Sequence, residues 1–156
     1  MKFSTREDIE APIDHVFEQV SDFIGFERRA LRHGADVVRL DDGPVQEGSS
    51  WNIAFQFRGR ERRMQSQLAA YDPPNGYLIT TMSDGMTITS NVDLVALSPG
   101  RTRVAVAIDL RAKTLTARLL LQSMKLAKTK LTKRFKARVL EYAEDVEDDY
   151  RRAMQT

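Results

Sequence analysis

Few side chains in this sequence could carry acid, base or metal chemistry. The chain has no cysteine and only two histidines, His15 and His33. A disulfide framework, a thiolate metal site and a cysteine nucleophile are therefore excluded. Two imidazoles without carboxylates at ligand spacing do not form a metal site, and no phosphate-binding loop, nucleophile elbow or zinc-protease motif occurs. We expect neither a metal nor a cofactor.

Four side chains stand where an acid or base could serve a reaction. His33 ends a predicted helix, Tyr71 and Tyr77 flank a turn, and Asp93 lies within a predicted strand. General acid–base catalysis needs such groups inside the substrate pocket. Asp93 alternates with apolar neighbours, which favours a position facing solvent. Catalysis is therefore the alternative, and binding without catalysis is the main hypothesis.

The elements that would position these groups follow from hydrophobic spacing. The 156 residues suit one domain, over residues 1–156. Apolar residues of 11–20 recur at helical spacing, and Asp22 and Gly34 are typical of the two ends of a second short helix. From Asp36 the period changes to two, with frequent turn signals. Strands are predicted at 3–10, 36–40, 50–58, 60–71, 76–83, 86–97 and 101–112.

After Lys113 helical spacing returns and continues towards the C-terminus. The order predicts an α+β fold: a curled seven-stranded antiparallel sheet wrapped around a long C-terminal helix, with two short helices after the first strand. One helix about 10 Å across cannot fill the concave side of so wide a sheet. Side chains fill the remaining space, or it is a pocket.

The sequence resembles the START-like or helix-grip superfamily, in its polyketide cyclase/dehydrase and lipid-transport branch. The resemblance lies in the segment Ile9-x-Ala11-Pro12-x-x-x-Val16-Phe17-x-x-Val20-Ser21-Asp22, in Gly48-x-x-Trp51, and in the long amphipathic C-terminal helix. It covers essentially the whole chain, and its motifs are structural. Members bind sterols, phospholipids, quinones, hormones or polyketides, so the resemblance implies a hydrophobic ligand without choosing one.

The predicted pocket lining combines apolar residues of the sheet with residues of the C-terminal helix that would face them. Alternation along the strands and helical spacing select the ligand-binding candidates Trp51, Ile53, Phe55, Phe57, Met64, Leu68, Ile79, Ile88, Val92, Val106, Ile108, Leu120, Met124, Ala127 and Leu131. Each of them could instead belong to a solid core. Methionine tolerates ligands of varied shape, which draws attention to Met64, Met82, Met86 and Met124.

Charge is segregated along the C-terminal part of the chain. Residues 113–138 hold nine basic residues and no acidic one, whereas 139–150 hold six acidic residues and no basic one. The basic part of the helix could touch an anionic membrane or an acidic partner, or it could be a solvated face. Acidic residues near the C-terminus of a helix oppose its dipole. A homodimer through antiparallel C-terminal helices would compensate them, and is a hypothesis.

The length of the C-terminal helical segment sets a further expectation. A continuous helix over 114–153 would measure roughly 60 Å, beyond the roughly 35 to 40 Å of a twelve-residue strand. The helix is therefore expected to break or to overhang the sheet.

Two further features limit the function. The cluster Arg58, Arg60, Arg62 and Arg63 lies around a turn without aromatic residues for base stacking, so no nucleic-acid partner is expected. The N-terminus lacks a signal-peptide pattern, and a cytoplasmic location is expected.

The main hypothesis is non-catalytic binding or transport of a small to medium hydrophobic ligand: a lipid, a quinone or a polyketide-like molecule. The alternatives are a cyclase- or dehydratase-type enzyme and a protein-interaction module acting through the charged helix.

Overall fold

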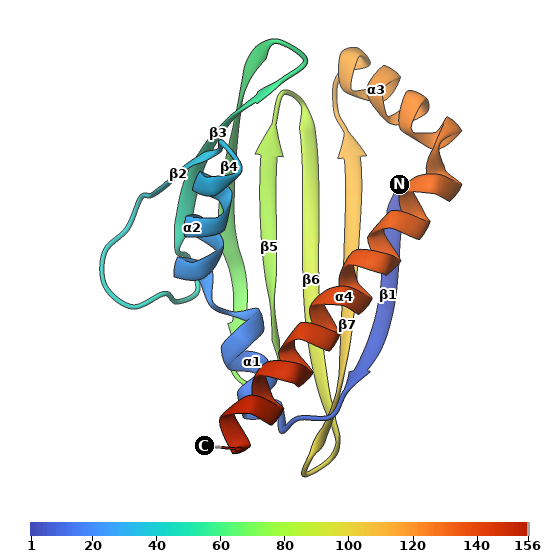
Figure 1. Ribbon diagram of the computed structural model, residues 1–156. Helices are drawn as coiled ribbons and strands as arrows, with labels where there is room; N and C mark the ends of the chain where they lie inside the picture. Colours follow the sequence, from blue (N-terminus) through green and yellow to red (C-terminus); the bar gives the residue numbers. More distant parts are fainter. Residues whose placement is uncertain (156) are drawn as a thin grey trace.

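A computed structural model describes residues 1–155 of the chain. Its centre is one antiparallel sheet of seven strands in the order β1-β7-β6-β5-β4-β3-β2 (Figure 1). The strands are β1 (Lys2–Ile9), β2 (Asp36–Arg39), β3 (Ser50–Phe57), β4 (Arg60–Asp72), β5 (Gly76–Ser83), β6 (Met86–Ser98) and β7 (Arg101–Ala112). The alternating pattern and turn signals located all seven, and the predicted α+β fold is confirmed.

Four helices lie against one face of this sheet or at its end (Figure 1). Between β1 and β2 the chain forms α1 (Ile13–Val20) and α2 (Phe23–Arg32). After β7 it forms α3 (Leu115–Leu126) and α4 (Lys128–Met154), separated by Ala127. The single C-terminal helix expected from the spacing therefore breaks after its first three turns. Only α4 crosses the sheet, and it packs mainly on β1.

The strand register defines two faces. Trp51 of β3 lies opposite Ser66, and Val92 of β6 lies opposite both Tyr77 and Val106. Because side chains alternate along a strand, these residues share the face that carries α1, α2 and α4, here called the inner face. Irregularities between Leu68 and Ala70 and between Ala96 and Ser98 interrupt the ladders. Such bulges increase local twist and help the sheet to curl.

The closely packed core lies at the end of the sheet where α1 meets α4. Side chains there are excluded from water: Ile9, Val16, Leu68, Thr102 and Val146 are essentially fully buried. The Thr102 hydroxyl donates to the carbonyl of Ala11 at 2.8 Å, so this buried polar group is satisfied. The opposite end of the inner face holds only a small buried cluster of Met86, Ala117 and Leu121, and that difference creates the candidate site.

Candidate functional site

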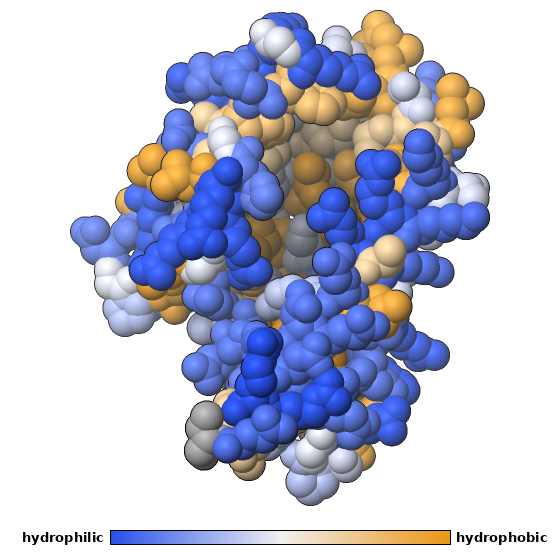
Figure 2. All heavy atoms as spheres, in the orientation of Figure 1, coloured by the Kyte–Doolittle hydropathy of each residue, from blue (hydrophilic) through white to orange (hydrophobic). Residues whose placement is uncertain are grey.

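A hollow opens on the inner face between α2 and α4, here called the inner hollow. Helix α4 covers β1 at one edge and α2 covers β2 at the other, which leaves the central strands uncovered towards the α3 end. Apolar side chains of this region are only half-buried, although they lie on the core side of the sheet: Ile53, Phe55, Met64, Ile79, Ile88, Ile108 and Leu110. Figure 2 shows the hollow as an apolar depression surrounded by polar side chains.

The lower end of the inner hollow, next to α1, is a cavity of about 310 Å³ under α4, here called the lower cavity. The lining is almost entirely apolar and comes from the sheet, the two short helices and α4: Val20, Phe26, Tyr77, Val92, Val104, Val106, Phe135, Arg138, Val139 and Tyr142. Small-molecule sites typically enclose about 300–1,000 Å³. The lower cavity alone can admit a small organic molecule.

Apolar surface continues along α4 beyond the lower cavity. A second pocket of about 310 Å³ is lined by Phe3, Met124, Leu131, Arg134, Phe135 and Arg138. It shares Phe135 and Arg138 with the lower cavity, so the two pockets adjoin. Phe3 packs its ring against that of Phe135, with centroids 6.1 Å apart. The apolar surface beneath α4 therefore extends beyond the lower cavity.

Arg62 is a charged residue on the inner face with an unused donor. It lies opposite Phe55 and on the same face as Met64. Its Nη1 atom is 3.9 Å from Asp84, whereas its buried Nε atom has no hydrogen-bond partner among residues 1–155. Further along the same face, the hydroxyls of Ser66 and Thr81 share a buried hydrogen bond of 2.7 Å. An unsatisfied buried donor is costly, so Arg62 can gain from an acceptor that a ligand brings.

Two tyrosines that border the lower cavity are committed to structure. The Tyr77 hydroxyl donates to the carbonyl of Val20 at 2.5 Å, and the Tyr142 hydroxyl donates to the carbonyl of Gln19 at 2.9 Å. These carbonyls lie in the last turn of α1, where helical donors run out, and that of Gln19 also accepts the Asp22 amide at 3.4 Å. Burial raises the pKa of Tyr77 well above its usual value and that of Tyr142 to about 12. Both phenols are neutral at physiological pH and hold α1 against the sheet and α4.

The acid–base candidates of the sequence do not converge. His33 and Asp93 are exposed to solvent, and Tyr77 donates to the backbone. Tyr71 is half-buried with its ring 5.8 Å from that of Phe17. Among residues 1–155, no group of three histidine, aspartate or glutamate side chains is placed to hold a metal ion.

The predicted lining residues fall into four groups. Val92 and Val106 line the lower cavity, and Met124 and Leu131 line the adjoining pocket. The half-buried wall of the inner hollow contains Ile53, Phe55, Met64, Ile79, Ile88 and Ile108. The others lie elsewhere: Trp51 and Leu68 in the packed core, Phe57 and Leu120 exposed, and Ala127 exposed at the helix break.

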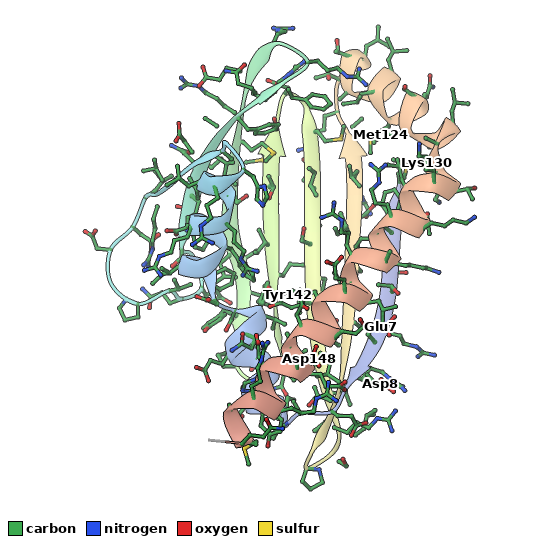
Figure 3. All side chains as sticks on the ribbon, in the orientation of Figure 1. Glu7, Asp8, Met124, Lys130, Tyr142 and Asp148 are labelled. Carbon is green, nitrogen blue, oxygen red and sulfur yellow. The ribbon has the colours of Figure 1, made fainter. Side chains whose placement is uncertain are left out.

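Several lining residues were missed from the site although their spacing was visible. Phe135, Val139 and Tyr142 continue the apolar repeat of the C-terminal segment, but the candidate set stops at Leu131. The break at Ala127 explains the difference, because α3 leaves the sheet and the part of the helix over the inner hollow begins later in the chain. Figure 3 shows Met124 near the break and Tyr142 over the lower end of the sheet.

A larger hollow lies mainly on the opposite, outer face of the sheet, although Ile53, Met64 and Met86 of the inner face also border it. It measures about 660 Å³ and its lining includes charged residues of β2, β4 and the β5–β6 turn: Asp36, Glu61, Arg63, Asp84 and, after β7, Lys113. Its lining is about half polar, whereas the lining of the lower cavity is almost entirely apolar. A hydrophobic ligand is desolvated better in the inner hollow.

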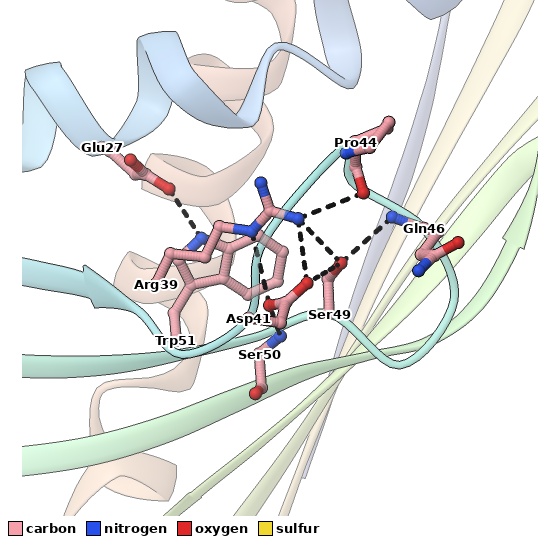
Figure 4. A network of polar contacts seen from close by, with 8 residues as sticks. All are labelled: Glu27, Arg39, Asp41, Pro44, Gln46, Ser49, Ser50 and Trp51. Atoms are coloured by element: carbon pink, nitrogen blue, oxygen red, sulfur yellow. Dashed lines mark hydrogen bonds and ion pairs between the residues drawn. The ribbon is translucent and has the colours of Figure 1, made fainter.

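A polar network fixes the loop and helix at the β2–β3 side of the hollow (Figure 4). Asp41 accepts hydrogen bonds from the Arg39 guanidinium, the Ser49 hydroxyl and the Ser50 amide. Next to it, the Trp51 indole donates to Glu27 of α2 at 2.7 Å. The network therefore holds the 40–49 loop to β3, while Trp51 joins the same strand to α2.

This network predicts a pH dependence of stability. The hydrogen bond from Arg39, followed by those from Ser50 and Ser49, holds the pKa of Asp41 well below its usual value. A carboxylate with a lowered folded-state pKa stabilises the protein above its unfolded-state pKa of about 4, and this contribution is lost as the pH falls further. Asp41→Asn should therefore lower the melting temperature at pH 7, and the difference from wild type should shrink at pH 2.5.

Thermal unfolding of Asp41→Asn and of the exposed neighbour variant Asp42→Asn measures this effect. Asp8, whose pKa Arg103 lowers, contributes equally to all three proteins. A deficit of Asp41→Asn that is the same at both pH values would contradict the assignment.

Comparisons with known proteins fit this geometry. The sequence profile of the family described as polyketide cyclase / dehydrase and lipid transport matches residues 1–147. No functionally curated protein matches the chain. Within residues 1–155, none of the helices combines the length and apolar character that crossing a membrane requires.

Solved structures of similar fold cover nearly the whole chain at low identity. TTHA0849 from Thermus thermophilus is 14% identical with a TM-score of 0.62, over 94% of this chain and 97% of that chain. The Zhui aromatase/cyclase from Streptomyces sp. R1128 is 16% identical with a TM-score of 0.61, over 92% and 93%. A protein from Arthrobacter aurescens is 14% identical with a TM-score of 0.60, over 95% and 86%. At such identities the similarity shows the fold alone.

Proposed function

Because the chain belongs to the polyketide cyclase / dehydrase and lipid transport family, we propose that it binds a hydrophobic small molecule in the inner hollow without catalysis. The apolar lower cavity of about 310 Å³ is the observation that carries this proposal. Removing apolar surface from water contributes about 25 cal/mol per Å² to binding before ordering costs. The half-buried residues that lie beyond the lower cavity give a larger ligand further surface.

Arg62 suits one end of such a ligand. The strand register places it towards the α3 end of the inner face, roughly 25 Å along the sheet from the level of Tyr77. An elongated molecule can thus keep its apolar body over the lower cavity and present a carboxylate or another acceptor to Arg62. Charge-assisted hydrogen bonds from a guanidinium are stronger than neutral ones. The proposed ligand class is an apolar molecule with one anionic or strongly polar end.

The role of Arg62 predicts a difference between two ligands of equal length. Arg62→Gln should weaken oleate binding about tenfold, from the loss of roughly 1.5 kcal/mol for a hydrogen bond to a charged group. Binding of oleyl alcohol should change less than twofold. Isothermal titration calorimetry with Arg62→Lys as the charge-preserving control measures both. Equal losses of affinity for oleate and for oleyl alcohol would show that Arg62 does not bind an anionic end of the ligand.

The proposed function is tested by identifying the molecules that co-purify with the protein. Native mass spectrometry of protein purified from cells, followed by solvent extraction, should find an apolar molecule bound with a stoichiometry near one. Absence of any such molecule, together with no binding across a panel of fatty acids, phospholipids and quinones, would overturn the proposal.

The structure does not favour the catalytic alternative, because His33 and Asp93 lie in solvent and the Tyr77 hydroxyl donates to the backbone. The homodimer through the C-terminal helices stays a prediction. Its rationale, that the acidic segment needs a partner from a second chain, is weakened by contacts within the chain. The acidic segment finds partners within the same chain: Asp148 and Asp149 pair with Arg151 and Arg152, and Glu147 accepts the amide of Glu10. The cytoplasmic location likewise stays a prediction.

A further inference from the structure

Helix α3 carries two apolar stripes on opposite sides. At about 100° per residue, Ala117, Leu121 and Met124 fall on one side, where the first two are buried against the sheet. Leu115, Leu119 and Leu126 fall within about 40° of one another on the other side. The structure leaves these three leucines 71%, 56% and 92% exposed. The second stripe, here called the outer stripe, contributes nothing to the core.

The outer stripe, which also contains Gln122, is a ridge with positive charge along one side. Arg118 and Lys125 lie on α3 beside it, and Lys128 and Lys130 follow in the first turn of α4. All four side chains are exposed, and the sequence holds no acidic residue from Lys113 to Arg138. Exposed leucines beside basic side chains are typical of helices that lie in the surface of an anionic bilayer, with the leucines in the acyl region and the cations at the headgroups.

The position of the ridge relates it to the inner hollow. Helix α3 lies at the end of the sheet where the hollow is least covered, and Figure 2 shows exposed apolar side chains at this end. Met124, on the inward side of α3, lines the pocket that adjoins the lower cavity. A surface that contacts the outer stripe therefore lies close to the opening through which a ligand would enter.

We propose that the outer stripe of α3 docks the protein on an anionic lipid surface, with Leu115, Leu119 and Leu126 inserted and the basic residues of α3 and the start of α4 at the headgroups. A protein groove would have to match a single protruding row of leucines, whereas a bilayer accepts it without a shaped partner. The purpose of such docking would be exchange of ligand with the membrane, and in this respect the inference rests on the proposed function. The observations on α3 do not depend on it.

Vesicle flotation tests the docking. Wild type should float with phosphatidylcholine vesicles containing 30% phosphatidylglycerol and much less with pure phosphatidylcholine. The double variant Leu119→Gln/Leu126→Gln should bind the anionic vesicles at least tenfold more weakly, since each buried leucine is worth about 1.5 kcal/mol or more. Lys125→Glu should cost about fivefold or more, because one basic residue near such a surface contributes about 1 kcal/mol.

A matched control uses exposed apolar residues at the other end of the sheet. Val95 and Leu97 on β6 are 56% and 42% exposed, and Val95→Gln/Leu97→Gln should float as wild type does. Equal losses for both double variants, or wild-type binding indifferent to phosphatidylglycerol, would overturn the proposal. A vesicle-free dimer in analytical ultracentrifugation that the stripe variant abolishes would assign the ridge to a second copy and overturn it as well.

Measuring vesicle flotation and oleate binding on the same proteins distinguishes failure of docking from failure of the proposed function. Oleate affinity of the stripe variant, measured without vesicles, should equal that of wild type. Loss of flotation with oleate binding intact supports the docking surface. Wild type that binds oleate but does not float refutes docking alone, and wild type that floats but binds no apolar ligand refutes the proposed function alone.

Discussion

Replacing Val106 with tryptophan is expected to lower the affinity for an apolar anionic probe, such as 8-anilinonaphthalene-1-sulfonate, about thirtyfold. Val106 lines the lower cavity and is half-buried, so the indole can extend into empty space rather than into packed neighbours. Filling the cavity removes roughly 80 Å² of apolar contact from the probe, which corresponds to about 2 kcal/mol. Fluorescence titration measures the change.

The control for this prediction is Val95→Trp, which introduces the same side chain on the outer face of the neighbouring strand. It should leave probe affinity within twofold of wild type. Near-identical melting temperatures would show that neither variant disturbs the fold. If both variants bind the probe as wild type does, the lower cavity is not the binding site.

Leu68→Ala is expected to lower the free energy of unfolding by about 3 kcal/mol, the typical cost of truncating a leucine in a packed core. The Leu68 side chain has no exposed surface and lies next to the β4 irregularity, among residues of the main core. Urea denaturation measures the loss. Once the fraction folded is corrected for, probe affinity should stay close to that of wild type.

Ile88→Ala provides the matched comparison, because Ile88 lies on the same face in the half-buried wall of the inner hollow. Truncation there should cost about 1 kcal/mol of stability, since part of the side chain already meets solvent. Its effect on ligand affinity should exceed that of Leu68→Ala. The opposite ranking in both measurements would mean that Leu68 contacts the ligand and Ile88 belongs to the core.

The sequence was a good guide to the sheet. Turns with glycine, proline or asparagine, such as those at Asp72–Gly76 and Ser98–Gly100, separate the strands, and alternation assigns each side chain to a face. Both signals are local. The face that would become the inner one was identifiable for the same reason, because Trp51, Val92 and Val106 alternate with polar residues.

How deeply each side chain of the inner face is buried could not be predicted from alternation. Trp51 and Ile53 alternate identically, yet α2 covers Trp51 through Phe23 and Glu27 whereas Ile53 is only half-buried. The covering depends on where α2 and α4 lie, which is a tertiary property. The helix break has a similar cause: length required a break or an overhang, but no proline or glycine marks Ala127, so its position was not predicted.

The contact between a bound ligand and the inner face tests the account most directly. Intermolecular nuclear Overhauser effects between oleate and ¹³C-labelled methyl groups should appear at Val92, Val106 and Val139, which line the lower cavity. Methyl groups of Val38 and Met82 in the outer hollow should show none. Contacts confined to Val38 and Met82, or saturating oleate without contacts at the three valines, would contradict the assignment of the inner hollow as the ligand site.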